Sequence, residues 1–100
     1  MDIPDEIVLN RIKIPTEWVD NLIADHDAFG VHMPRFPKIL LDKSLSKQVA
    51  GKIYFHEFVE AVIAIDDLDD IKDDEKTKTA IANRFYELFE QLLEKMEKKS

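Results

Sequence analysis

Residues Ser44–Leu68 read SLSKQVAGKIYFHEFVEAVIAIDDL, and their apolar side chains recur at the spacing of an α-helix. On a helical wheel, one face of this helix carries Ile53, His56, Glu60 and Ile63. Most of the remaining surface is covered by further apolar residues: Phe55, Phe58, Val59 and Val62. A helix that is apolar nearly all round is buried. We therefore expect a buried helix that carries a histidine and a carboxylate on one of its faces.

Strands and one helix are expected before this helix. Residues 7–14 (IVLNRIKI) are rich in β-branched side chains and are typical of a half-buried strand. The helical spacing of apolar residues over Thr16–Phe29, with Thr16 as a candidate N-cap, predicts a first helix that Gly30 ends. Two prolines within residues 31–42 exclude a helix interior and a central strand, so we predict a strand at a sheet edge, around Lys38–Leu41.

The segment after the buried helix begins with an acidic run, DDLDDIKDDE, at residues 66–75. Asp73 or Asp74 can cap a last, amphipathic helix, whose apolar stripe is expected to face the core: Ile81, Phe85, Leu88, Phe89, Leu92 and Met96. The resulting order is strand, helix, strand, strand, helix, helix. We therefore predict an α+β fold over residues 1–100, in which a small sheet with an edge strand packs on the buried helix.

The composition narrows the class of protein. The chain has 100 residues, 45% of them hydrophobic, with a net charge of -7 and no cysteine. This length suits one domain, and the missing cysteines exclude disulfides and thiolate metal sites. The negative charge argues against a nucleic-acid partner. No apolar run approaches the roughly 20 residues needed to span a membrane, and the acidic start is unlike a secretory signal, so we expect a cytoplasmic protein.

The buried helix carries one pattern that points to chemistry. His56 and Glu60 are four residues apart, so their side chains lie one turn apart on the same face. Burying a carboxylate among apolar residues costs several kcal/mol unless a cation satisfies it. A divalent metal ion bound by both residues would do so, with Glu57 as a base for water, which is the logic of the HExxH helix. The alternative is an intrahelical His56–Glu60 ion pair with no metal.

The sequence also resembles a known family. Residues 38–65 look like the core of the ImmA/IrrE-type metallopeptidases, minimal zincins common in phages and other mobile elements. Residues 39–42 resemble the family's strand, and residues 56–62 (HEFVEAV) resemble its HE-x-x-HA helix, with glutamate in place of the second histidine. Part of the last helix resembles the family's second helix, at Ala82, Asn83, Phe85, Tyr86 and Leu88. The resemblance implies a single minimal zincin-like domain.

The resemblance also implies roles for individual residues. His56 matches the first metal ligand, and Glu57 matches the general base. Glu60 takes the place of the second histidine and can bind metal as a carboxylate. The family's third ligand is an acidic residue near the last helix, where the spacing of larger members reaches Thr79, which cannot serve, and a shorter spacing reaches Glu75. Such a set would hold Zn²⁺, or the harder ions Mn²⁺ or Fe²⁺.

Three hypotheses for function follow. The first is a metal-dependent peptidase of phage or mobile-element origin, whose substrate, a protein or peptide, lies along the strand at Lys38–Leu41. The second is a zincin-fold accessory protein that has lost catalysis and binds or inhibits a host protein through an acidic surface. The third is a domain without metal, in which His56 and Glu60 only pack. Under the first two, the protein acts in the cytoplasm of the host cell.

Overall fold

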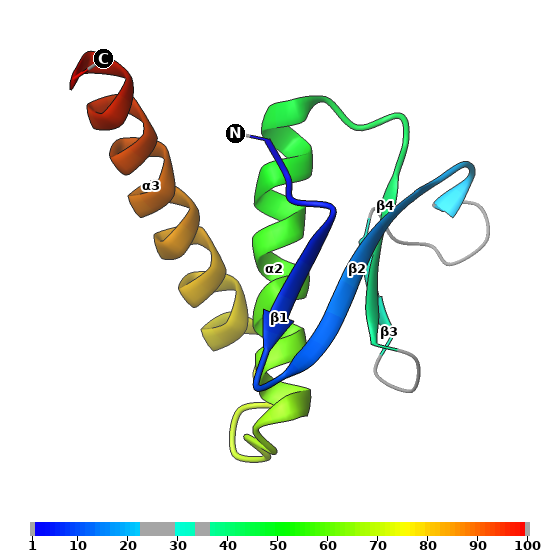
Figure 1. The fold of residues 1–100 in the computed structure, drawn as a ribbon. Helices are drawn as coiled ribbons and strands as arrows, with labels where there is room; N and C mark the ends of the chain where they lie inside the picture. Colours follow the sequence, from blue (N-terminus) through cyan, green and yellow to red (C-terminus); the bar gives the residue numbers. More distant parts are fainter. Residues whose placement is uncertain (1, 23–29, 34–36, 100) are drawn as a thin grey trace.

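The computed structural model describes residues 2–22, 30–33 and 37–99. Its elements are strands β1 (Glu6–Leu9), β2 (Ile12–Val19), β3 (Gly30–Met33) and β4 (Lys38–Asp42), followed by helices α2 (Lys47–Ile65) and α3 (Glu75–Lys99). The four strands form one mixed sheet in the order β1-β2-β4-β3. In Figure 1, α2 separates α3 from β4 and β3. The predicted α+β fold class is therefore confirmed for the described residues.

The first predicted strand is in fact a hairpin. Residues 7–14 divide between β1 and β2, which pair antiparallel with Leu9 opposite Ile12. The two-residue turn between them has positive φ at both positions, 49° at Asn10 and 66° at Arg11. Two left-handed residues are the mark of a type I′ turn, whose twist matches that of the flanking strands. The prediction of one strand was wrong because this turn lacks the glycine that usually signals it.

Arg11→Gly is expected to raise the free energy of unfolding by about 0.5 kcal/mol, because a side chain in the left-handed region is strained and glycine is not. Urea denaturation followed by circular dichroism measures this change. Lys13→Gly, two residues further along in β2, is the control and should lower stability, because glycine weakens a strand. A loss of stability in Arg11→Gly would contradict the assigned turn.

The prediction of a helix beginning at Thr16 is also wrong for residues 16–19, which belong to β2. β2 continues to Val19 and pairs in parallel with β4, placing Thr16 opposite Ile39. Pro15 lies where β2 passes from one partner strand to the other, a place that tolerates its missing N–H. The backbone N–H of Thr16 donates to the carbonyl of Asp5 at 2.8 Å. Long-range pairing thus overrides the local helical spacing, and residues 23–29 of the predicted helix lie outside the described residues.

The strand around Lys38–Leu41 exists, but it is not at an edge. β4 lies between β2 and β3, and the edge strand beside α2 is β3. The proline argument failed because Pro37 precedes the strand, so every residue of β4 keeps its N–H. The buried core gathers where β2 and β4 meet α2, and its members include Ile14, Ile39, Leu41, Tyr54 and Ala61. An edge strand packed on the buried helix is present, and it is Gly30–Met33.

The buried helix and the start of the last helix agree with prediction. Ser46 caps α2, accepting a hydrogen bond from the Val49 N–H at 3.3 Å. Asp74 caps α3, with its carboxylate accepting from the Thr77 N–H at 3.0 Å and from the Thr77 hydroxyl at 2.6 Å. The helices meet closely at Gly51, where an added Cβ would lie 2.8 Å from the Tyr86 ring.

The apolar stripe of α3 faces the core only in part, contrary to prediction: Ile81 packs against the buried cluster that α2 and α3 share. Ala82 and Tyr86 are the buried apolar residues of this helix. Figure 1 shows the C-terminal half of α3 diverging from α2. The other residues of the stripe are 44–67% exposed: Phe85, Leu88, Phe89, Leu92 and Met96. The amphipathic pattern was read correctly, but the angle between the helices leaves most of the stripe in water.

Candidate metal centre

The structure brings the three predicted metal ligands together. His56 and Glu60 lie on α2, and Glu75 is the first residue of α3. Each offers one ligand atom, and these atoms all lie within 4.8 Å of one another. His56 Nε2 is 3.8 Å from Glu75 Oε2. Ligand atoms around a tetrahedral zinc ion lie roughly 3.4 Å apart, so small side-chain movements would close the set around an ion.

The turn between the helices explains why Glu75 faces His56. α2 ends in a Schellman-type motif, in which the Leu68 N–H donates to the Ile63 carbonyl at 3.0 Å and Asp67 has φ 52°. Two further turns follow, closed by hydrogen bonds to the carbonyls of Leu68 and Ile71. The chain thus reverses direction, and Glu75 begins α3 beside the face of α2 that carries the other two ligands.

Lys78 is a fourth member of this cluster, and the sequence did not suggest it. Only 2% of the residue is exposed. Its Nζ lies 2.7 Å from both Glu60 Oε1 and Glu75 Oε1, and donates to the Lys72 carbonyl at 2.6 Å. Burial opposes the charged form most strongly, but hydrogen bonds to the two carboxylates prevail and raise the pKa of Lys78. The i, i+3 spacing of Glu75 and Lys78 was the one available signal.

Glu57, the predicted base, lies beside the cluster. Burial, and next the negative charge of Glu60, raise the pKa of the Glu57 carboxyl to about 7. The backbone N–H of His32 on β3 and the ammonium of Lys78 act in the opposite direction. A carboxyl group whose pKa lies near neutrality can both accept and return a proton at physiological pH.

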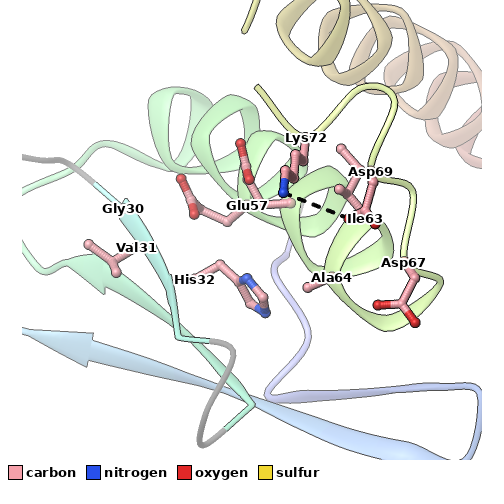
Figure 2. Close-up of a pocket in the computed structure, with 10 residues that line it drawn as sticks. Gly30, Val31, His32, Glu57, Ile63, Ala64, Asp67, Asp69 and Lys72 are labelled. Atoms are coloured by element: carbon pink, nitrogen blue, oxygen red, sulfur yellow. Dashed lines mark ion pairs between the residues drawn. The ribbon is translucent and has the colours of Figure 1, made fainter. Parts of the chain in front are cut away.

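A pocket opens between β3 and α2 at this point. Figure 2 shows Gly30, Val31 and His32 on the strand side, with α2 and the following loop on the other. Glu57 and Glu60 both line the pocket. His32 is a lining residue that the sequence did not assign, and burial, partly offset by Glu60, lowers the pKa of its imidazole. The strand can approach this closely because Gly30 has no side chain: a Cβ there would lie 2.5 Å from Ile53 Cγ2.

The donor set fits a divalent metal ion. One imidazole and two carboxylates suit Zn²⁺, Mn²⁺ or Fe²⁺. The His56 Nδ1 atom is buried and has no hydrogen-bond partner among the described residues. Metal-binding imidazoles usually donate their other N–H to a neighbouring group, which fixes the orientation of the ring. At this site the described residues supply three candidate ligands but no such acceptor for His56.

No protein-family model, curated protein or solved structure matches this chain. The resemblance to the ImmA/IrrE-type metallopeptidases therefore remains a prediction from the motifs. Within the described residues, no helix combines the length and the apolar character needed to cross a membrane.

Proposed function

We propose that this chain is a metal-dependent peptidase, with His56, Glu60 and Glu75 as ligands of one divalent ion and Glu57 as the general base. The proposal is supported chiefly by the meeting of three predicted ligand atoms within 4.8 Å, from two different helices. Zinc is the first candidate, and manganese or iron are the others, because two of the three ligands are carboxylates.

In the proposed hydrolysis of a peptide bond, the bound metal ion and Glu57 have separate roles. The metal ion, when bound, supplies the Lewis acidity that polarises the scissile carbonyl and acidifies water. Glu57 takes a proton from the attacking water as its oxygen bonds to the carbonyl carbon. Glu57 then returns that proton to the amine as the C–N bond breaks. The balance is one water consumed and one acid and one amine formed.

The substrate would lie along β3. This strand is at the sheet edge, paired only with β4 among the described strands, and it borders the pocket that Glu57 lines. An extended peptide can add to such an edge through backbone hydrogen bonds. β3 thereby takes the role that the sequence had assigned to Lys38–Leu41.

Isothermal titration of the metal-stripped protein with Zn²⁺ and with Mn²⁺ tests the metal site. We expect one equivalent to bind, and His56→Ala to weaken binding at least about tenfold because only two carboxylates remain. His32→Ala is the matched control, since His32 lines the pocket without belonging to the ligand set, and it should bind like the wild type. Absence of binding by the wild type at millimolar ion would refute the proposal.

A second candidate function is a non-catalytic protein that binds a basic partner. Two observations favour it. Lys78 already neutralises part of the carboxylate cluster without any metal. The adjoining loop and helix start expose many carboxylates: Asp66, Asp67, Asp69, Asp70, Asp73, Asp74 and Glu75. A biological effect that persists in Glu57→Gln would favour this candidate over the peptidase.

A further inference from the structure

All three N–H donors of the Lys78 ammonium group have partners. An ammonium group offers three N–H bonds, and here two meet carboxylate oxygens while the third meets the Lys72 carbonyl. The side chain is 3% exposed, so water cannot replace these partners. Without the ammonium, the carboxylates of Glu60 and Glu75 would face each other with no cation between them, although their side chains are 27% and 69% exposed. Lys78 is therefore a fixed part of the metal-free cluster.

The same two carboxylates would have to bind the metal. Glu60 and Glu75 each give one oxygen to Lys78, and a divalent ion held by these groups would lie within a few ångströms of the ammonium. Two cations at such a distance repel strongly in a partly buried site. Either the ion is bound weakly beside Lys78, or Lys78 gives up carboxylate contacts when the ion binds.

We infer that Lys78 is a built-in counter-ion that competes with divalent metal for Glu60 and Glu75. The inference rests on the proposed metal site and states how that site is regulated. In the metal-free protein, the ammonium keeps two neighbouring carboxylates from repelling each other. The pair of helices α2 and α3 is then stable without metal, and the fraction of metal sites that are occupied follows the concentration of free ion.

The test compares Lys78→Met with Lys76→Met, which removes the same charge from an exposed position of α3. Titration with Zn²⁺ and with Mn²⁺ measures the affinity, and thermal denaturation in a chelator measures the stability of the metal-free form. We expect Lys78→Met to bind at least ten times more tightly than the wild type and to melt at a lower temperature without metal. Lys76→Met should match the wild type in both measurements.

The opposite signs of the two effects separate competition from a purely structural role, which would weaken both binding and folding. Lys78→Gln, which keeps hydrogen-bond donors without the charge, serves as the second variant if Lys78→Met does not fold. Equal or weaker binding by the variants, with normal binding by the wild type, would overturn the inference alone. Binding by the variants but not by the wild type would support the inference and overturn the peptidase proposal, and binding by none would overturn both.

Discussion

Glu57→Gln is expected to bind metal like the wild type and to hydrolyse peptides at least about 100-fold more slowly. The amide is nearly the same size as the carboxylate and its oxygen can still accept a hydrogen bond from the backbone N–H of His32, but it cannot take up the proton of the attacking water. General acid–base catalysis typically contributes 100-fold or more to the rate. The measurement is kcat/KM on a fluorogenic peptide library with metal-loaded protein.

Glu6→Gln is the control for this prediction, because Glu6 is exposed on β1, at the opposite edge of the sheet from the β3 strand that borders the pocket. It should retain the wild-type rate. If Glu57→Gln hydrolyses peptides as fast as the wild type, Glu57 is not the base. If it also loses metal, the slower rate would report a damaged site and not the loss of proton transfer.

Leu41→Ala is expected to lower the free energy of unfolding by about 3 kcal/mol. Leu41 is fully buried on β4, between β2 and β3, and packs in the core that joins the sheet to α2. Removing its branched end leaves a cavity in addition to the lost burial, and such changes cost about 2–5 kcal/mol. Urea denaturation measures the loss, which is a large part of the 5–15 kcal/mol typical of a domain.

Val8→Ala provides the comparison, since Val8 is 57% exposed on β1 and should change stability by less than about 0.5 kcal/mol. A loss in Leu41→Ala as small as that in Val8→Ala would contradict the interior position of β4.

The two helices could be predicted from sequence because their signals are local. Ser46 and Asp74 cap them, and the spacing of apolar residues runs unbroken through each. The pairing of His56 and Glu60 could be predicted for the same reason, because side chains four residues apart in a helix lie next to each other on one face. Glu75 was predicted through family spacing, and the structure places one of its carboxylate oxygens within 4.8 Å of the candidate ligand atoms of His56 and Glu60.

The strands were harder because their partners lie far away in the chain. Trp18 and Val19 fit a helical spacing as well as a strand, and parallel pairing with β4 decides between them. The position of Lys78 in the carboxylate cluster was not predicted, for a related reason. Its burial depends on how α3 packs on α2, and the i, i+3 spacing of Glu75 and Lys78 does not by itself distinguish a buried pair from an exposed one. The angle between the helices, which exposes Phe85 and Phe89, is likewise a property of packing.

The proposed ligands and Lys78 all come from one helical hairpin, and this placement has a consequence for the order of folding. Closing the short loop at residues 66–74 costs little chain entropy, whereas β2 must meet β4 across a longer separation, as in the pair Thr16 and Ile39. We therefore expect the ligand set to assemble early in folding, before the parallel pairing is complete. The sheet then supplies what the hairpin lacks, the β3 wall of the pocket.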